Sequence, residues 1–315
     1  MKKILIQAFP KLYEKYSFNR IKQLEQKKSV YYKSLSSEAY KGEIIRLYKE
    51  KTGNDLDLKA PKRYTEKIQW MKLYGITPLI SKLSDKYEVR DWVAEKIGTE
   101  YLVPLLGVWS SFDEIRFEEL PDSFVLKTNN ASATNIIVNS KANMNKRWMK
   151  QKIDYWMERP FGFLSGLELQ YMAIKPRIIA EKNLMSEGLT DLPDYKFFCF
   201  DGKVFCSYTM VDYTFNHENG RLGFFDRDYR LMDAYRADYA RISEQIPRPK
   251  NYDKMVEIAE TLSKDFSHVR VDLYNIDGKI YFGEMTFTTN SGYTVFVPDE
   301  FDYELGKQWV LPISE

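Results

Sequence analysis

The chain has 315 residues, of which 44% are hydrophobic and 15% aromatic, so it can bury a sizeable core and is not a disordered protein. A net charge of only +2 argues against a protein coated in basic charge for nucleic acid. Two cysteines and two histidines exclude a disulfide framework, fit a reducing compartment and leave carboxylates as the expected ligands of any metal.

Positive charge is concentrated at the N-terminus, where residues 1–35 hold nine Lys and Arg against Glu14 and Glu25. We expect a basic helical region over residues 1–60. A solvated leader helix is the simpler interpretation, and a helix at a membrane surface is the alternative. Since no stretch approaches the roughly 18 apolar residues of a membrane span, we expect a cytoplasmic protein. Residues 1–35 would then allow peripheral contact with the inner face of the membrane or with glycan-assembly proteins.

Helices are expected next along the chain. Thr65-Glu66-Lys67 opens a helix that Gly75 ends, and Ser84-Asp85-Lys86 starts another that ends at Gly98. We interpret residues 61–120 as a helical and α+β region that precedes the main domain, residues 121–310.

From residue 101 the pattern changes to strands, which we expect at residues 124–128, 135–139 and within 176–184. Two hairpins are expected around Asp201-Gly202 and Asp277-Gly278. Helices are expected over 145–158 and 252–266. This order predicts an α+β fold with mostly antiparallel sheets.

The most informative segment is residues 269–286, VRVDLYNIDGKIYFGEMT. In its first strand apolar residues alternate with Arg270, Asp272 and Tyr274, so one face carries a cation and a carboxylate. In the second strand, alternation places four residues on one face: Ile280, Phe282, Glu284 and Thr286.

The register of this hairpin decides whether the charged groups meet. A two-residue turn at 277–278 would pair Asp272 with Gly283 and turn Glu284 away. A three-residue loop, 276–278, pairs Arg270 with Glu284 and Asp272 with Phe282. We predict the second register, because it brings Arg270, Asp272, Glu284 and Thr286 to one face.

Paired carboxylates on a rigid sheet suit a hard cation such as Mg²⁺. Taken alone, the hairpin fits a surface salt bridge between Arg270 and Glu284 equally well. His268, just before the first strand, is more simply a solvated or hydrogen-bonded strand end than a ligand of a softer metal.

Four weaker signals precede the hairpin, and each has an ordinary alternative. Lys127 ends an apolar strand beside a loop of small residues and can meet a phosphate. Residues 181–184 form a polar strand end whose backbone could bind an adenine edge. The other two are charged sites, at Asp194-Tyr195-Lys196 and at Asp85-Lys86, where a solvated strand start and a helix N-cap are the ordinary interpretations.

Taken together, the order of these segments resembles the ATP-grasp superfamily over roughly residues 60–300. The sequences of residues 64–70, YTEKIQW, and 85–90, DKYEVR, are similar to those of the TupA-like amidoligase branch, which is associated with the synthesis of bacterial surface polysaccharide and teichuronopeptide. The resemblance implies two α+β lobes whose antiparallel sheets clamp ATP. It also implies an amide-forming, ADP-producing ligase that works through an acyl phosphate.

The resemblance also implies roles for individual residues. Lys86 and Lys127 would hold the α- and β-phosphates, and Asp194 would meet the ribose. The adenine would lie against the hinge near residues 181–184, that is, Glu181, Lys182, Asn183 and Leu184. The Mg²⁺ shell would comprise Asp272, Glu284 and Thr286. Arg270 would stabilise charge on the acyl phosphate, and Lys196 would contact the γ-phosphate or the acceptor.

The chain departs from the family pattern at two points. Thr286 stands where many relatives have Asn, and a hydroxyl is a poorer metal ligand than an amide carbonyl. The loop of residues 128–135 has no glycine, although Ala131, Ser132 and Ala133 keep it small. These changes concern the metal shell and the tightness of the phosphate loop.

The expected partners are ATP, a carboxylate-bearing sugar or glycan such as a uronic acid, and an amine or amino acid. One rival interpretation is a metal-dependent glycosyltransferase that uses Asp226-Arg227-Asp228, although a solvated turn explains that triplet more simply. Another rival is a non-catalytic glycan-binding protein of the same fold, which the 23 tyrosines and six tryptophans would suit.

Overall fold

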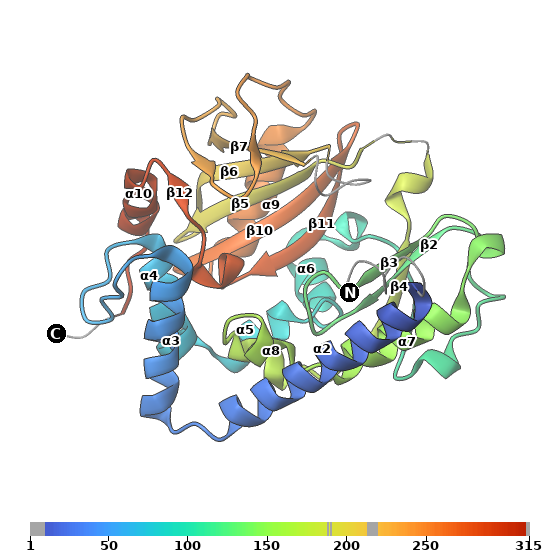
Figure 1. Cartoon of the computed structure of the whole chain (residues 1–315). Helices are drawn as coiled ribbons and strands as arrows, with labels where there is room; N and C mark the ends of the chain where they lie inside the picture. Colours follow the sequence, from blue (N-terminus) through green and yellow to red (C-terminus); the bar gives the residue numbers. More distant parts are fainter. Residues whose placement is uncertain (1–9, 188, 190, 213–219, 313–315) are drawn as a thin grey trace.

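The computed structural model describes residues 10–187, 189, 191–212 and 220–312. These residues form a four-stranded sheet, a six-stranded sheet and a two-stranded ribbon, with helices packed around them (Figure 1). Part of the basic N-terminal segment, residues 1–9, lies outside the described residues.

The N-terminal third is helical, as predicted. Its helices are α2 (Pro10–Lys33), α3 (Ser37–Thr52), α4 (Tyr64–Trp70), α5 (Pro78–Ser84) and α6 (Val89–Ile97). The helix predicted from Thr65 continues beyond α4 as a π-helical turn, η1 (Met71–Gly75), and ends at Gly75 as expected. Ser84 closes α5 and does not open a helix, because α6 begins only at Val89.

The small sheet has the strand order β1-β4-β2-β3, and each neighbouring pair is antiparallel. Its strands are β1 (Leu105–Trp109), β2 (Phe124–Thr128), β3 (Asn135–Val138) and β4 (Ile178–Lys182). Helix α7 (Lys146–Glu158) covers this sheet with Met149 and Ile153, which are 2% and 0% exposed. The short helix α8 (Phe161–Leu164) follows it.

The large sheet has the order β11-β10-β5-β6-β7-β9 and is antiparallel except for its β7–β9 edge. The strands are β5 (Asp194–Phe200), β6 (Lys203–Val211), β7 (Arg221–Asp226), β9 (Ala240–Arg241), β10 (His268–Ile276) and β11 (Lys279–Thr286). A ribbon of β8 (Tyr235–Arg236) and β12 (Phe296–Val297) borders it. Both predicted hairpins are present, and Asp201, Gly202, Asp277 and Gly278 all have the positive φ of a tight hairpin turn.

The two faces of the large sheet bury different residues. On one face Val269, Val271 and Leu273 are fully buried beneath α9 (Tyr252–Ser263). Burial of each such side chain contributes about 1.5–3 kcal/mol. On the other face α4 and α10 (Glu300–Gln308) enclose aromatic residues of β5, β6 and β7. This second face also carries the charged residues of β10. Because alternate residues of a strand point to opposite faces, burial of Val269, Val271 and Leu273 on one face places Arg270 and Asp272 on the other.

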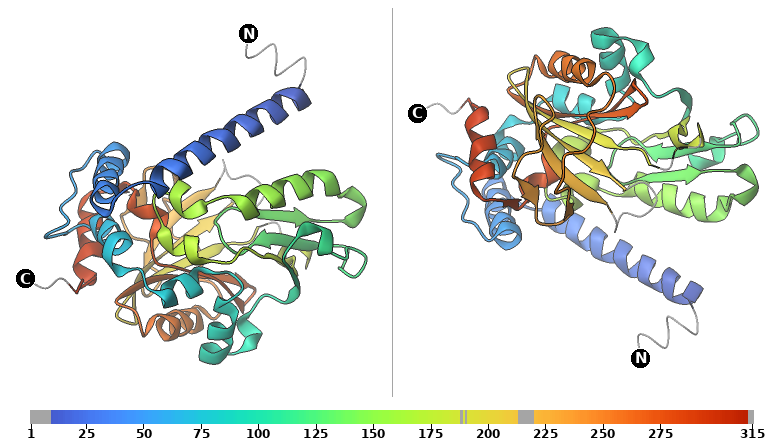
Figure 2. Two further views of the ribbon diagram at one scale, coloured as in Figure 1. Left: turned by 90° about the horizontal axis from the view of Figure 1, so that it is seen from below. Right: turned by 90° about the horizontal axis from the view of Figure 1, so that it is seen from above.

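Helix α2 extends away from both sheets at its N-terminal end (Figure 2). Its later turns pack on the chain near α8, where the rings of Tyr32 and Phe163 stack and Arg159 binds Glu25. Among the described residues no helix is long and apolar enough to cross a membrane. Two antiparallel sheets with packed helices confirm the predicted α+β class.

Candidate active site

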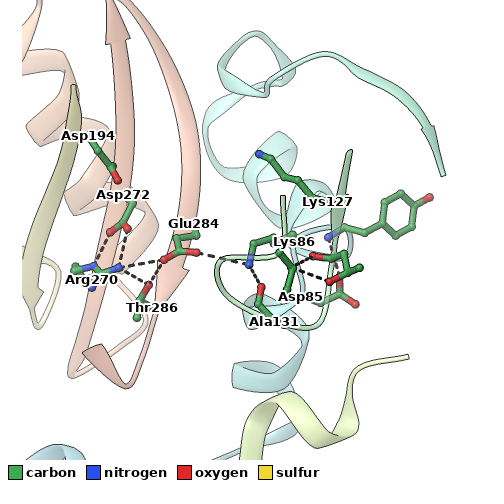
Figure 3. A network of polar contacts seen from close by, with 12 residues as sticks. Asp85, Lys86, Lys127, Ala131, Asp194, Arg270, Asp272, Glu284 and Thr286 are labelled. Carbon is green, nitrogen blue, oxygen red and sulfur yellow. Dashed lines mark hydrogen bonds and ion pairs between the residues drawn. The ribbon is translucent and has the colours of Figure 1, made fainter. Parts of the chain in front are cut away.

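The charged residues of β10 and β11 form one cluster on the polar face of the large sheet (Figure 3). Arg270 binds Asp272 with both Nε and Nη2, each at 2.7 Å. Its Nη2 also donates to Glu284 Oε1 at 3.1 Å and to Thr286 Oγ1 at 3.0 Å. The three predicted metal ligands therefore converge, and the point at which they meet is one nitrogen of Arg270.

The register that produces this cluster differs from both registers considered for the sequence. The turn has two residues, with Ile276 opposite Lys279, which would place Asp272 opposite Gly283. A β-bulge between Asp272 and Leu273 shifts the ladder, so Asp272 lies opposite Glu284. The predicted three-residue loop is therefore wrong, although the predicted meeting of Asp272 and Glu284 is observed.

The same bulge corrects the predicted face of β11. Ile280 and Phe282 belong to the core beneath α9, whereas Glu284 and Thr286 bind Arg270 on the opposite face. Strict alternation had placed all four on one face. A bulge inserts one extra residue and reverses the faces of those that follow, and Gly283 is the residue inserted here.

Strand β5 adds a second cation to the cluster, because Lys196 lies opposite Asp272 in the ladder. Lys196 Nζ lies 2.5 Å from an oxygen of Asp272 and 2.5 Å from an oxygen of Asp194. Burial lowers the pKa of Lys196, but these two carboxylates outweigh burial and raise it well above its usual value. Lys196 is therefore a fixed positive charge within the cluster.

Glu284 remains ionised in this environment. Burial raises its pKa, but the attraction of Lys86, Lys196 and Arg270 outweighs burial and lowers the pKa to about 2. Burial raises the pKa of Asp272. The attraction of Arg270 and Lys196 lowers it but does not fully offset burial. The cluster thus presents at least one permanently charged carboxylate to the space beside it.

Lys86 and Lys127 lie across that space, on the side of the small sheet (Figure 3). Lys86 Nζ donates to Ala131 O at 2.7 Å and lies 3.8 Å from Glu284 Oε2. Burial lowers the pKa of Lys86. Lys86 therefore links the loop after β2 to the carboxylate cluster of the other sheet.

The turn before α6 is fixed by Asp85. Its Oδ1 accepts from the backbone N–H groups of Tyr87 and Glu88, and its Oδ2 accepts from Asn129 Nδ2 at 2.9 Å. Asp85 thus caps the turn of residues 86–88, whereas α6 itself begins at Val89 without a side-chain cap. Asp85 also ties this turn to the 128–135 loop, which places Lys86.

Lys127 does not project freely from its strand. It donates to Glu181 Oε2 at 2.6 Å, and Arg90 donates to Glu181 Oε1 at 3.1 Å. The side chain of Glu181 is 9% exposed. Its contacts with Lys127 and Arg90 therefore hold it inside the cleft between the sheets. The sequence interpretation missed Arg90, although its position in the DKYEVR segment was the available signal.

The residues that follow Glu181 close the end of the small sheet. Asn183 donates to Ser123 Oγ at 3.0 Å, and its own Oδ1 accepts from the N–H of Met185. Leu184 packs with Val103 and Tyr281. Lys182 donates its backbone N–H to Pro104. The side chains of Asn183 and Leu184 therefore hold the hinge segment in place.

Two cavities meet at the carboxylate cluster. The first runs between the sheets and is lined by most of the predicted residues, including Lys86, Lys127, Glu181, Asp194, Lys196, Asp272 and Glu284. The second lies beside Arg270, Thr286 and a group of tyrosines. Four residues line both cavities: Ser132, Asp194, Lys196 and Glu284. Two bound molecules could therefore approach one another at this cluster.

Two other sequence candidates lie elsewhere. Asp226 and Asp228 flank a turn at the end of β7, and Arg230 pairs with both carboxylates. His268 is 3% exposed and hydrogen-bonds to Tyr64 and to the carbonyl of Cys199, so it is an interior residue and not a solvated strand end. Cys199 and Cys206 are buried and free.

Two antiparallel sheets that enclose a cleft with such a charged cluster define the class of the protein as an ATP-grasp fold. The family model described as TupA-like ATPgrasp matches residues 66–310. The chain therefore belongs to the TupA-like ATP-grasp family. Membership supports the predicted class of ATP-dependent carboxylate–amine ligases.

Solved structures of ATP-grasp proteins are distant neighbours. The D-alanine–D-alanine ligase of Bacillus anthracis is 15% identical, with a TM-score of 0.42 over 73% of this chain and 66% of that one. The corresponding ligase of Helicobacter pylori is 12% identical, with a TM-score of 0.37 over 79% of this chain and 70% of that one. Biotin carboxylase of Campylobacter jejuni is 10% identical, with a TM-score of 0.39 over 74% of this chain and 48% of that one. No curated protein matches the chain.

Proposed function

We propose that this protein is an ATP-dependent carboxylate–amine ligase that forms an amide through an acyl phosphate and releases ADP. Membership of the family supports this proposal. The observation that carries it is the placement of Asp272 and Glu284 on one face of the large sheet, opposite Lys86 and Lys127 across the first cavity. Phosphoryl transfer needs positioning and charge stabilisation more than a protein nucleophile, and this site offers both.

The donor atoms at the cluster fit Mg²⁺, which prefers carboxylate oxygens together with substrate phosphates. Asp194 Oδ1 is buried and accepts no hydrogen bond from the described residues. Glu284 is ionised and lines both cavities. Among the described residues no group of three or more Asp, Glu, His and Cys is placed to hold a metal ion. Bound Mg²⁺ would neutralise the charge that develops on the transferred phosphoryl group.

The site residues then have the following roles. Asp272 and Glu284 would hold the metal, and Thr286 donates to Glu284 and so orients it. Lys86 and Lys127 hold phosphates, which requires Lys127 to exchange Glu181 for a phosphate oxygen. Asp194 meets the ribose or the metal, and the cleft beside Val103 and the hinge of residues 181–184 holds adenine.

The reaction proceeds in two steps. A carboxylate oxygen of the donor attacks the γ-phosphorus, the bond to the bridging oxygen breaks, and ADP leaves. The neutral amine nitrogen then attacks the carbonyl carbon of the acyl phosphate, the bond from carbon to the phosphate oxygen breaks, and phosphate departs with the proton that the nitrogen loses. Arg270, fixed by Asp272, stabilises the negative charge of the acyl phosphate and of the tetrahedral oxyanion.

The substrates are proposed from the family resemblance. The acyl donor is a uronic-acid carboxylate of a bacterial surface polysaccharide or its precursor, and the acceptor is an amino acid or another amine. Helix α2 would bring the enzyme to the membrane on which such glycans are assembled, because it projects from the body of the protein with exposed basic residues (Figure 2).

Glu284→Gln tests the proposal directly. We expect it to lower the rate of ADP release by about 10³-fold, because a metal-held charge is worth several kcal/mol in the transition state. Steady-state ADP release with uronic-acid glycans and a panel of amines is the measurement. Asp226→Asn is the matched control and should keep full activity; the glycosyltransferase rival predicts the opposite pattern.

Ligand-induced stabilisation separates the remaining alternatives. ATP with Mg²⁺ should raise the melting temperature of the wild type, whereas a glycosyltransferase would respond to a UDP-sugar with Mn²⁺. A non-catalytic glycan-binding protein would retain glycan binding in Asp272→Asn and Glu284→Gln and would release no ADP in any form. ADP release by the wild type eliminates that alternative.

A further inference from the structure

Asn129 is the first residue after β2 and lies where three segments of the chain meet. These are the loop that follows β2, the turn before α6 and the segment of residues 175–177, which leads into β4. Asn129 is 0% exposed and is not among the residues that line the two cavities. It cannot contact a molecule bound in the cleft, so any effect on binding must act through its neighbours.

The side chain of Asn129 makes a hydrogen bond that its backbone would otherwise make. Residues 129 and 177 continue the β2–β4 ladder beyond its last pair, Thr128 and Ile178. Two residues in such a hydrogen-bonded position normally exchange both backbone N–H···O bonds. Here the N–H of Asn129 donates to Arg177 O at 3.1 Å, but the N–H of Arg177 donates to the side-chain Oδ1 of Asn129, at 2.6 Å. The backbone carbonyl of Asn129 is thereby available to another donor.

That donor is the backbone N–H of Lys86, at 3.2 Å from Asn129 O. The other end of the lysine is held by the same loop, because Lys86 Nζ donates to Ala131 O at 2.7 Å (Figure 3). The ammonium group lies beside the first cavity, 3.8 Å from Glu284 Oε2. The position of this lysine therefore depends on the backbone of the loop at Asn129.

The nitrogen of the Asn129 amide also has defined partners. It donates to Asp85 Oδ2 at 2.9 Å and to Lys175 O at 3.0 Å. Asp85 is 4% exposed, and its Oδ1 accepts from the N–H groups of Tyr87 and Glu88. The position of Nδ2 therefore requires a donor, whereas the position of Oδ1 requires an acceptor. An amide satisfies both requirements, and an ionised carboxylate satisfies only the second.

We propose that Asn129 is a positioning residue of the nucleotide site, whose side-chain amide sets the place of Lys86 for a phosphate of ATP. The inference rests on the proposed function and adds to it a residue that contacts neither substrate nor metal. A cation that is already held in place loses little freedom when it binds a phosphate. Asn129 supplies this preorganisation, because its side chain frees the carbonyl that holds the backbone of Lys86.

Equilibrium binding of β,γ-methylene-ATP with Mg²⁺, measured by isothermal titration, tests the inference without turnover. Asn129→Asp keeps the size of the side chain but places a carboxylate oxygen against Asp85 and against Lys175 O. We expect it to weaken binding by ~10-fold or more, because a charge-assisted hydrogen bond to phosphate is misplaced. Wild-type affinity in Asn129→Asp would overturn the inference.

A comparison with Lys86→Gln shows whether Asn129 acts through this lysine. Lys86→Gln should itself weaken binding by ~10-fold or more. Once the lysine is absent, Asn129→Asp should weaken binding by no more than about twofold further, because changes that act on one interaction are not additive. If the losses of the two single variants multiply in the double variant, or if Lys86→Gln binds like the wild type, the inference is wrong.

The reciprocal exchange is a second test, which also serves if Asn129→Asp folds poorly. Asp85→Asn alone would set two amide N–H groups against one another, because its other atom must still accept from Tyr87 and Glu88. When Asp85→Asn is combined with Asn129→Asp, an amide and a carboxylate face each other again. The combined variant should bind the analogue more tightly than either single variant, although the bond to Lys175 O is not restored. Affinity no better than that of the single variants would overturn the inference.

Asn275→Asp is the matched control, because Asn275 is also a buried amide bound to the backbone. It is 8% exposed, its Nδ2 donates to Lys250 O at 2.7 Å, and its Oδ1 accepts from the N–H of Gly278 at 2.8 Å. Its free energy of unfolding should fall, because a buried charge replaces an amide. Its affinity for the analogue should stay within about twofold of the wild type. A loss as large as that of Asn129→Asp would overturn the inference.

The wild type separates this inference from the proposed function. If the wild type does not bind β,γ-methylene-ATP with Mg²⁺, the proposed function fails and the inference fails with it. If the wild type binds the analogue and Asn129→Asp binds it equally well, the inference alone fails.

Discussion

His268 shows what burial does to a single titratable residue. Its ring centre lies 4.6 Å from those of Phe200 and Trp309 and 5.0 Å from that of Tyr64. Burial lowers the pKa of His268 to about 3, and Arg270 adds repulsion. The folded protein therefore holds a neutral imidazole, which hydrogen-bonds to Tyr64 and to the backbone of Cys199.

This shift predicts a loss of stability in acid. Because the folded pKa lies below the unfolded value of about 6.5, the unfolded state binds the proton and the free energy of unfolding falls as pH drops below about 6.5. At ~1.4 kcal/mol per pH unit, His268 should account for roughly 2 kcal/mol between pH 7.5 and 5.0. Urea unfolding of the wild type and of His268→Gln at about pH 7.5 and 5.0 measures this loss of unfolding free energy. Equal losses in the two proteins would contradict the prediction.

Alternation along β10 let the sequence predict that Arg270 and Asp272 share a face. The sequence analysis placed Glu284 beside them through a three-residue loop that the structure does not have, and Glu284 reaches them because of the bulge at Gly283. Glu168 and Arg236 lie in segments without a regular period, and they line one cavity because segments far apart in the chain pack together. No local signal in the sequence marks such residues as partners.

Gly283 determines the geometry of the hairpin that carries the proposed metal ligands. A Cβ at this position would lie 3.0 Å from the backbone oxygen of Asp272, closer than an ordinary contact. To relieve this close contact, β10 and β11 would have to separate at the point where Asp272 and Glu284 face one another. The bulge thus couples a glycine to the spacing of the two carboxylates.

We therefore expect Gly283→Ala to impair catalysis more than stability. ADP release should fall by about tenfold or more, because misplacement of catalytic groups by about 1 Å can cost ~10²-fold. The free energy of unfolding should fall by only about 1–2 kcal/mol. Gly42→Ala in α3, where nothing lies within 4 Å of the new Cβ, is the control and should be fully active. Full activity of Gly283→Ala would show that the bulge tolerates a side chain.

The same hairpin marks the limit of prediction for an element. Asp277-Gly278 identifies the turn, since both residues need positive φ and this pair adopts it readily. The bulge has no comparable signature, because it depends on how two strands pack against the core and the cleft. Its one trace in the sequence is Gly283, and a glycine within a strand can equally mark a tight bend or a close approach of another backbone.

At the scale of the whole molecule, the N-terminal end of α2 projects from the body of the protein (Figure 2). One of its two acidic residues, Glu25, faces the body and binds Arg159. Its outward side carries exposed basic and apolar groups: Arg20, Lys27, Lys28, Ile21 and Leu24. Basic residues interleaved with apolar ones complement an anionic lipid surface.

We expect this outward side to bind anionic vesicles. Each lysine near such a surface contributes about 1 kcal/mol, so Lys27→Gln with Lys28→Gln should weaken binding by roughly 30-fold. Cosedimentation with phosphatidylserine vesicles measures this, and phosphatidylcholine vesicles should bind neither protein. Lys203→Gln with Lys279→Gln, an equal change of charge on the hairpin tips of the large sheet, should bind like the wild type. If both double variants lose affinity equally, net charge and not α2 would govern the interaction, and α2 would be a solvated helix.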